Sequence, residues 1–304
     1  MILACGEALI DMLPRVSLQG EAAFAPYPGG AVFNTAIGLG RLGVQTQFLC
    51  GMSSDFLGDI LRDALDSSNV DHRPSPKLNA PCSVAFVKLV DGQATYAFYD
   101  ENSAMRSLNT APDINANTLF FGGISLVGDG CGNTYEALML REAPRRVTMI
   151  DPNIRPSFIK NIATHRMRIN QMMAAADIIK LSDEDLHWIE GKGDLSELAK
   201  GLVAKGAKLV CITEGAKGAT GYSADHKVFV PSERAVVIDT VGAGDTFNSG
   251  LLAGLDRAGA LTKERIANLS EEDIRAALHL GVRTAAVTVS RSGANPPTAA
   301  ELGL

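Results

Sequence analysis

The sequence lacks the features that mark several classes of protein. Its net charge is −6 and no block of Lys and Arg occurs, so it has no basic segment of the kind that binds nucleic acid or an anionic membrane. No apolar run approaches the ~18 residues of a membrane span. Residues 1–9 have neither the basic start nor the cleavage site of a secretory signal. We therefore expect a cytoplasmic protein without a nucleic-acid or membrane partner.

Disulfide, metal and common nucleotide motifs are also missing. Five cysteines are scattered without C-x-x-C or Cys/His spacing, which predicts buried, reduced thiols at Cys5, Cys50, Cys82, Cys131 and Cys211. No G-x-G-x-x-G follows the first predicted strand, which argues against a dinucleotide-dependent dehydrogenase. No G-x-x-x-x-G-K-[ST] occurs, which excludes a P-loop kinase.

What the sequence does contain is an alternation of apolar strands and helices. At 304 residues and 46% hydrophobic, it is long enough for one large domain, and we treat 1–304 as a single domain. Strands are predicted at 2–10, 45–51, 119–126, 146–150, 178–181 and 208–213. Helices are predicted at 31–43, 55–65, 134–143, 162–175, 183–190, 195–204, 244–256 and 273–287. The pattern predicts an α/β fold, a mainly parallel central sheet with helices on both faces.

A predicted hairpin interrupts this rhythm. Residues 82–89 and 95–99 are β-branched and aromatic runs joined through Asp91-Gly92, a typical hairpin turn. We expect this hairpin to lie outside the main sheet, with residues 13–27 as its partner. A small sheet of this kind over a ligand would exclude water from the site. Its exposed face would be a reasonable surface for a homodimer.

The stretch Gly242-Ala243-Gly244-Asp245 opens a predicted helix late in the chain. The glycines permit a tight turn that presents backbone N–H groups at a helix N-terminus, which favours an anion. Beside a bound phosphate, an ionised Asp245 would accept the proton of an attacking hydroxyl. A simple helix-capping role for Asp245 is the alternative that these residues alone leave open.

Polar residues far upstream fall where a hydroxylated ligand could be held. Asp11 ends the first predicted strand, and ligands bind at the carboxyl ends of strands in open α/β sheets. Gly29-Gly30 precedes a helix whose first turn holds Asn34, an amide that both donates and accepts. Arg155 follows the strand at 146–150 and is expected at the same edge. Each residue is also compatible with an ordinary strand end, helix entry or solvated loop.

The segment Thr213-Glu214-Gly215-Ala216-Lys217-Gly218 follows the strand at 208–213. Its glycines suit a turn that contacts the phosphate or ribose of a nucleotide. A hairpin turn leading to 219–222 and 228–230 is the alternative, and the segment alone favours it.

Together these motifs resemble the ribokinase-like (PfkB) carbohydrate kinases, with bacterial fructokinases the most similar branch. The stretch 29–43 resembles the first signature of the family, and 239–247 resembles the second, D-T-x-G-A-G-D-T-F. Residues 151–155 are similar to the D-x-N-x-R segment found between them. The resemblance implies a three-layer α/β/α fold with a β-sheet lid from about 12–28 and 81–101.

The resemblance also implies roles for individual residues. Asp245 would be the base, with the anion hole formed by Gly242, Ala243, Gly244 and the Asp245 amide. The sugar would be held by Asp11, Gly29, Gly30, Asn34, Phe98, Asp100 and Arg155. The nucleotide would lie along Ser182, Thr213, Gly215, Lys217 and Gly218. A monovalent cation, K⁺ in many members, would be held at Asp239, Val241, Arg291 and Gly293.

Two departures from the family pattern bear on function. Ser182 and Asp185 stand where an N-x-x-E element usually helps to place Mg²⁺, and a shorter carboxylate can still reach the ion through water. Asp100 stands where ketodeoxygluconate kinases carry an Arg, and an acid there would repel a sugar carboxylate. A neutral sugar is therefore favoured over a sugar acid.

The function implied is that of an ATP- and Mg²⁺-dependent fructokinase-type enzyme, a phosphotransferase with an alcohol acceptor. It would transfer the γ-phosphoryl group of ATP to a primary hydroxyl of D-fructose, giving fructose 6-phosphate. The alternatives are another kinase of the family, acting on ketodeoxygluconate, ribose or a nucleoside, and a non-catalytic sugar-binding sensor.

Overall fold

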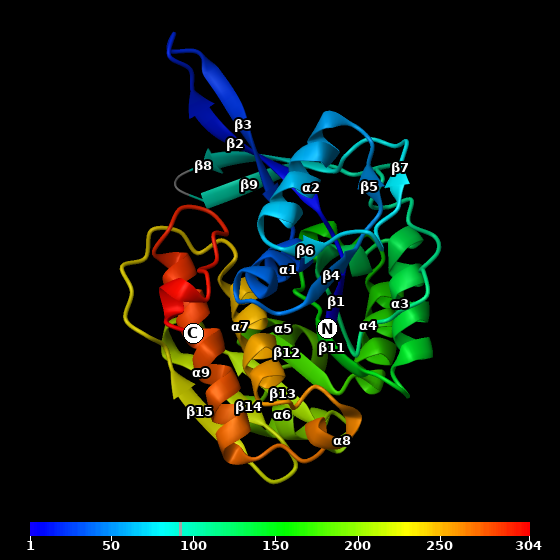
Figure 1. Cartoon of the computed structure of the whole chain (residues 1–304), viewed down its shortest axis with the longest axis vertical. Helices are drawn as coiled ribbons and strands as arrows, with labels where there is room; N and C mark the ends of the chain where they lie inside the picture. The colour runs from blue at the N-terminus through cyan, green and yellow to red at the C-terminus, as the bar shows by residue number, and fades with distance from the viewer. Residues whose placement is uncertain (91–92) are drawn as a thin grey trace.

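A long, mostly parallel sheet forms the centre of the molecule (Figure 1). The computed structural model describes residues 1–90 and 93–304. Strand order in the main sheet is β15-β14-β13-β12-β11-β10-β1-β4-β6. The strands are β1 (Ile2–Cys5), β4 (Thr46–Leu49), β6 (Val70–Asp71), β10 (Thr118–Gly122), β11 (Val147–Asp151), β12 (Ile178–Ser182), β13 (Leu209–Thr213), β14 (Gly218–Tyr222) and β15 (Lys227–Pro231). Pairing is parallel from β6 to β13 and antiparallel from β13 to β15.

The connections run outward from β1 in both directions, first to β4 and β6 and later to β10 and beyond. The sheet therefore has a topological switch point between β1 and β10. Because parallel strands covered on both faces have no solvated side, each reads as a short, continuous apolar run. The residues of β1 (Ile-Leu-Ala-Cys) and of β10 (Thr-Leu-Phe-Phe-Gly) are all buried.

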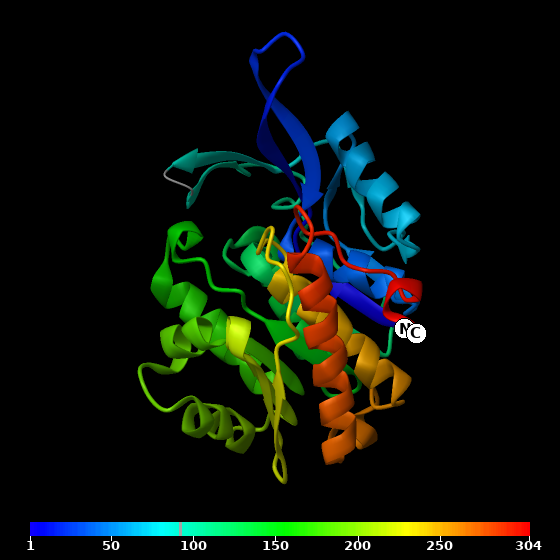
Figure 2. The same ribbon diagram turned by 90° about the vertical axis from the view of Figure 1, so that its left-hand side faces the viewer.

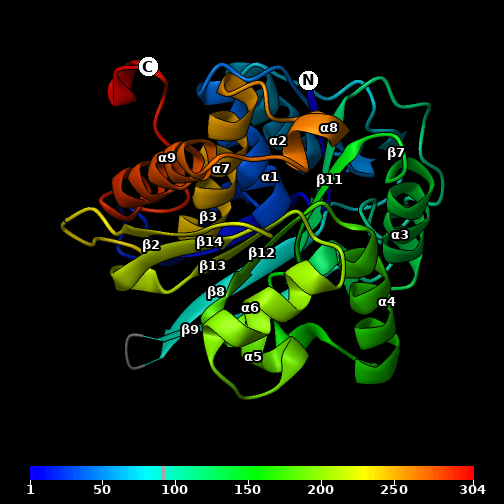
Figure 3. The same ribbon diagram turned by 90° about the horizontal axis from the view of Figure 1, so that it is seen from below.

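Helices cover both faces of this sheet, with α7 and α9 on one side and α5 and α6 on the other (Figure 3). Helix α1 packs on α7, and α3 packs on α4. The helices are α1 (Ala31–Arg41), α2 (Phe56–Ser67), α3 (Gly130–Glu142), α4 (Ile162–Ala175), α5 (Asp183–Glu190), α6 (Leu195–Ala204), α7 (Ala243–Arg257), α8 (Lys263–Ile266) and α9 (Glu271–Val289). This arrangement confirms the predicted three-layer α/β class. In the described part of the chain, no helix is long and apolar enough to cross a membrane.

A second sheet stands away from the main body (Figures 1 and 2). Its strand order is β3-β2-β8-β9, with β2 (Leu9–Val16), β3 (Ala22–Gly29), β8 (Val84–Val90) and β9 (Gln93–Tyr99). The β2–β3 and β8–β9 pairs are antiparallel, whereas β2 and β8 run parallel. The turn predicted at Asp91-Gly92 lies outside the described residues. Strands β5 (Met52–Ser53) and β7 (Lys77–Leu78) form a separate small pair.

Two predicted strands end earlier than the apolar pattern suggests. The predicted strand 2–10 is divided, because β1 ends at Cys5 and β2 begins at Leu9 in the other sheet. The predicted strand 119–126 ends at Gly122, and residues 123–126 form the 3₁₀ turn η1 (Gly123–Leu126). The sequence pattern placed Asp11 at the end of a core strand, and this prediction was wrong. In the structure, Asp11 lies in β2 of the small sheet. A change from one sheet to another and a buried 3₁₀ turn both leave the sequence apolar, which explains the two errors.

Candidate active site

A cavity of about 590 Å³ lies where the small sheet meets the carboxyl ends of the parallel strands. This is the edge at which open α/β sheets bind ligands. Its walls include Glu7, Asp11, Gly30, Asn34, Phe98, Arg155, Lys180, Ser182, Glu184, Asp185, Thr213, Thr240, Val241, Gly242, Ala243, Gly244 and Asp245. Residues from opposite ends of the sequence therefore meet in one space.

The floor of this cavity is the N-terminus of α7. Gly242 precedes the helix in the left-handed conformation (φ 77°), and a Cβ at this position would lie 2.5 Å from the side chain of Ala294. Only glycine is therefore tolerated there without rearrangement. Within the described chain, no side chain caps this end of the helix. The helix dipole and its terminal N–H groups thus make this end of α7 suitable for a phosphate group.

Asp245 lies in the first turn of α7 and is nearly buried. Its pKa is raised to about 7, mainly by burial and also by the charge of Asp151, against the opposing effect of a hydrogen bond from Asn34. The Asn34 amide Nδ2 donates to Asp245 Oδ2 at 2.9 Å, and the Thr35 hydroxyl donates to the Asp245 carbonyl at 3.0 Å. These contacts fix α1 against α7 and leave a carboxylate that can take up a proton near neutral pH.

The small sheet supplies the opposite wall. Asp11 comes from β2, and burial raises the pKa of its carboxyl group to about 6. Gly29 ends β3, where it pairs with Leu9, and Gly30 precedes α1. Phe98 of β9 packs edge-on against Phe158, with ring centroids 5.0 Å apart. The structure therefore gathers Asp11, Gly30 and Phe98 around the same space as Asp245.

Charged residues within β11 and β12 form the third wall. Lys180 is buried and pairs with Asp151 at 2.9 Å, and Asn248 Nδ2 donates to the same carboxylate oxygen at 2.6 Å. Burial alone lowers the pKa of Lys180, but the charge of Asp151 and its hydrogen bond raise it overall, so the ammonium group stays charged.

Two carboxylates and a serine at the start of α5 complete this wall. The Ser182 hydroxyl accepts a hydrogen bond from the Asp185 N–H at 3.0 Å and so caps α5. Asp185 Oδ1 accepts from the backbone N–H of Ile154 at 3.1 Å. This bond holds the loop that carries Arg155 at the edge of the cavity.

Several predicted site residues lie beside the cavity instead of lining it. Asp100 lines an adjoining cavity of about 1080 Å³, where its carboxylate accepts from Arg106 Nε at 2.6 Å. Of the predicted nucleotide segment, Thr213 lines the central cavity. Gly215 and Lys217 form a 3₁₀ turn, η3 (Gly215–Lys217), that leads into β14 at Gly218. Lys217 is exposed and pairs with Glu214 at 3.0 Å.

The residues predicted for a monovalent cation are brought together by Asp239. Its Oδ1 accepts from the Val241 N–H at 3.0 Å, and its Oδ2 accepts from the Gly293 N–H at 2.8 Å. Arg291, in the same turn as Gly293, pairs with Glu301. Across the described residues, no cluster of three or more His, Cys, Asp or Glu side chains could hold a metal ion.

Sequence reasoning missed Glu7 and Lys180. Both are charged residues within or beside apolar runs, and in the structure both are buried and line the cavity. A charged residue in a strand that is otherwise apolar was the available signal, because such a residue is rarely buried without a partner.

Fold and site together define a carbohydrate kinase of the ribokinase-like type. Residues 1–301 match the model of the pfkB family of carbohydrate kinases, and the chain belongs to this family. It is 56% identical over 279 residues to a fructokinase of Rhizobium leguminosarum bv. trifolii, covering 90% of this chain and 86% of that protein. A probable fructokinase-7 of Arabidopsis thaliana is 32% identical, covering 97% and 89% of the two chains.

Solved structures agree with this assignment. A fructokinase from Xylella fastidiosa with bound ATP superposes with a TM-score of 0.88 at 28% identity, covering 96% of this chain and 93% of that one. The resemblance to PfkB kinases predicted from the motifs is confirmed. The protein is thus a phosphotransferase with an alcohol acceptor.

Proposed function

We propose that this protein transfers the γ-phosphoryl group of ATP to the primary hydroxyl of D-fructose, giving fructose 6-phosphate. The observation that carries the proposal is the 56% identity to a fructokinase over most of the chain. A buried carboxylate beside an anion-binding helix end, in a cavity of about 590 Å³, supports the same chemistry.

In this proposal Asp245 orients and deprotonates the hydroxyl. Because an alcohol is far less acidic than a carboxylic acid, the proton moves late, as charge leaves the nucleophile in a loose transition state. The raised pKa of Asp245, about 7, makes the carboxylate a better base than an ordinary Asp. Positioning and charge stabilisation then supply most of the rate.

The remaining residues hold the two substrates. Backbone N–H groups of Gly242, Ala243, Gly244 and Asp245 receive the transferring phosphoryl group. Asp11, Gly29, Gly30, Asn34 and Phe98 contact the sugar, and Arg155 reaches between sugar and phosphates. Asp100, paired with Arg106 in the adjoining cavity, holds the end of β9 beside the sugar. ATP lies along Ser182 and the segment Thr213–Gly218.

Two cations complete the proposal. Glu184 and Asp185 present carboxylate oxygens at the cavity, a donor set that suits hydrated Mg²⁺ held through water. Mg²⁺ would neutralise charge on the phosphates. For K⁺, Asp239 ties the loops of Val241 and Gly293 together beside the anion hole, and these loops would hold the ion. Arg291 would take part through its backbone oxygen.

A panel of acceptors tests the substrate. Turnover is measured with ATP and fructose, ribose, adenosine or ketodeoxygluconate, and we expect the highest kcat/KM with fructose. A higher kcat/KM with another acceptor would reassign the enzyme within the family. Tight fructose binding by calorimetry without phosphoryl transfer would identify a sugar sensor instead.

The same proposal includes a homodimer through the small sheet. Exposed apolar side chains lie on the face of β2 and β3 that is opposite Asp11, at Val16 and Phe24, and in the turn between the strands, at Leu18. Such a patch on a sheet is typical of a protein interface. Light scattering should give twice the monomer mass for the native chain and the monomer mass for the double variant V16S/F24S. A native monomer at micromolar concentration would refute the dimer.

We also propose a cytoplasmic location. All five cysteines are free and buried, as expected of a protein made in a reducing compartment. Fractionation of the native host with an antibody against the chain tests this, and enrichment in a membrane or secreted fraction would contradict it.

A further inference from the structure

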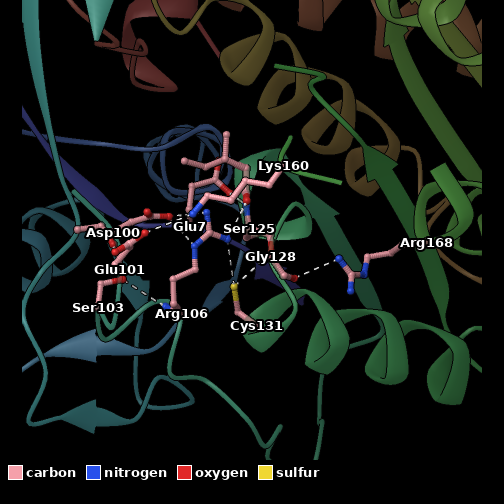
Figure 4. A network of polar contacts seen from close by, with 12 residues as sticks. Glu7, Asp100, Glu101, Ser103, Arg106, Ser125, Gly128, Cys131, Lys160 and Arg168 are labelled. Carbon is pink, nitrogen blue, oxygen red and sulfur yellow. Dashed lines mark hydrogen bonds and ion pairs between the residues drawn. The ribbon is translucent and has the colours of Figure 1, made fainter. Parts of the chain in front are cut away.

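Glu7 is a buried carboxylate that joins two elements of the active site. It lies between β1 and β2, is 1% exposed and lines the central cavity. Its Oε1 accepts from the backbone N–H of Ala31 at 2.9 Å, and its Oε2 accepts from the backbone N–H of Ser125 at 3.2 Å. Figure 4 shows Glu7 beside Ser125 at the centre of the surrounding polar network. Both oxygens of Glu7 are therefore used to hold backbone N–H groups from different parts of the chain.

The first of these contacts fixes the start of α1. Gly30, at φ 113°, makes no side-chain cap for this helix, and a Cβ at Gly30 would lie 2.8 Å from the Glu7 carbonyl. Glu7 thus supplies, from outside the helix, the hydrogen-bond acceptor that Gly30 cannot provide at this helix N-terminus. One turn later, Asn34 donates to Asp245 at 2.9 Å. The position of Gly30 and Asn34 therefore depends on the contact between Glu7 and Ala31.

The second contact leads to the base of the small sheet. Ser125 belongs to η1, and Arg106 Nη1 donates to the neighbouring carbonyl of Ile124 at 3.1 Å. Arg106 also pairs with Asp100, the residue directly after β9. Cys131 Sγ donates to the Ser125 carbonyl at 3.2 Å and lies 3.8 Å from Arg106 Nη1 (Figure 4). A chain of polar contacts therefore runs from the end of β9, through η1 and Glu7, to α1 and Asp245.

We propose that Glu7 is a positioning residue for the sugar site, which sets the N-terminus of α1 and, through η1 and Arg106, couples it to the small sheet. The inference rests on the proposed function, because it takes Gly30 and Asn34 as ligands of the sugar. Thr213, on the nucleotide side, ends β13, and strands β12, β11 and β10 stand between β13 and β1, the strand that precedes Glu7. Loss of the Glu7 carboxylate should therefore affect the sugar and ATP unequally.

The test is the isosteric variant Glu7→Gln. A glutamine can accept from only one of the two N–H groups, so the other is left without its partner. We expect the KM for fructose to rise about tenfold or more, with the KM for ATP within about twofold of the native value. Equal changes in both KM values would overturn the proposal.

Glu142→Gln is the matched control. Glu142 is also a buried carboxylate, but it ends α3 and pairs with Arg141, Arg145 and Arg146. Helix α3 connects the end of β10 to the start of the parallel strand β11, so its last residue, Glu142, lies toward the edge of the sheet opposite the cavity. Glu142→Gln should lower the melting temperature without changing the ratio of the two KM values. A changed ratio in this control would mean that the KM ratio reports general destabilisation, and it would overturn the proposal.

Arg106→Lys tests the second half of the chain of contacts and keeps the proposal testable if Glu7→Gln does not fold. Lysine keeps the charge but lacks the separate, rigidly spaced nitrogens with which Arg106 contacts Asp100 and Ile124. The fructose KM should rise while the ATP KM stays constant, and the double variant should show less than the product of the two single effects. Independent effects, which multiply in the double variant, would refute the coupling.

Failure of the proposed substrate would look different. Absence of fructose turnover in the native enzyme would reject fructose as the substrate, and the same variants would then be compared with the sugar that the acceptor panel identifies.

Discussion

Asn34 donates its side-chain amide to the carboxylate of Asp245 at 2.9 Å, across 211 positions of sequence. The two residues come from helices that pack against each other, α1 and α7. The hydrogen bond orients the carboxylate and stabilises its charged form, which opposes the effect of burial on the pKa. The proposed base therefore depends on a helix that also carries the proposed sugar contact Asn34.

Replacing Asp245 by asparagine tests its role as the base. Because general-base catalysis contributes ~10²–10⁴-fold, kcat for fructose should fall by that factor in Asp245→Asn. ATP affinity, measured by calorimetry, should stay within about threefold, since the backbone N–H groups at 242–245 are kept. Near-normal turnover would show that another group takes the proton.

The pH dependence of the reaction should respond to Asn34. Asp245 must be ionised to act as a base, so kcat/KM should fall as the pH drops below about 7. Removal of the Asn34 hydrogen bond in Asn34→Ala raises the pKa of Asp245 further, because burial then acts unopposed by that bond. The acid limb should therefore move to higher pH, and an unchanged limb would argue that Asp245 does not control it.

Thermal stability should report the same pKa in the absence of substrate. The folded-state pKa of Asp245, about 7, lies above its ordinary value of 3.8, so the folded protein holds this proton more tightly than the unfolded chain. The ionised carboxylate thus destabilises the fold fully above pH 7, and the penalty shrinks as the pH falls toward 4. Asp245→Asn should raise the Tm by about 5 °C at pH 8 and by less at pH 5. Asp113→Asn, at an exposed carboxylate, is the control and should change neither value.

The proposed sugar contact at Asp11 predicts unequal effects on the two substrates. Asp11→Ala should raise the fructose KM by about tenfold or more and leave the ATP KM nearly unchanged, because a hydrogen bond to a charged group is lost on one side only. Asp63→Ala, on the exposed surface of α2, serves as the control. Equal increases for fructose and ATP would count against a sugar-binding role.

The buried pair of Lys180 and Asp151 should matter for stability. Lys180→Met leaves Asp151, 2% exposed, without its cation, and an unpaired buried charge costs ~3–5 kcal/mol. Chemical denaturation should therefore show a much lower free energy of unfolding. Lys200→Met removes an exposed pair with Glu197 and should cause no measurable change. A native-like free energy of unfolding for Lys180→Met would mean that Asp151 is protonated or solvated in the variant.

Local patterns in the sequence predicted much of this architecture. Contiguous features, such as the apolar runs of the core strands and the glycine turn before Asp245, act within a few residues and so appear directly in the sequence. The α/β class, the strands after residue 146 and the partnership of 13–27 with the hairpin strands were all predicted in this way. Strand ends were predicted less well, since the break after Cys5 reflects a change of sheet and not a change of polarity.

The sequence by itself determined the family, the anion-binding turn at 242–245 and the identity of the proposed base, because each rests on adjacent residues in a specific order. Only the tertiary structure decided that Asp11 belongs to the small sheet, that Asn34 contacts Asp245 and that Asp100 pairs with Arg106. It also placed Glu7 between α1 and η1. These relationships join residues from separate elements, and the distances between such elements are set by the packing of the whole core.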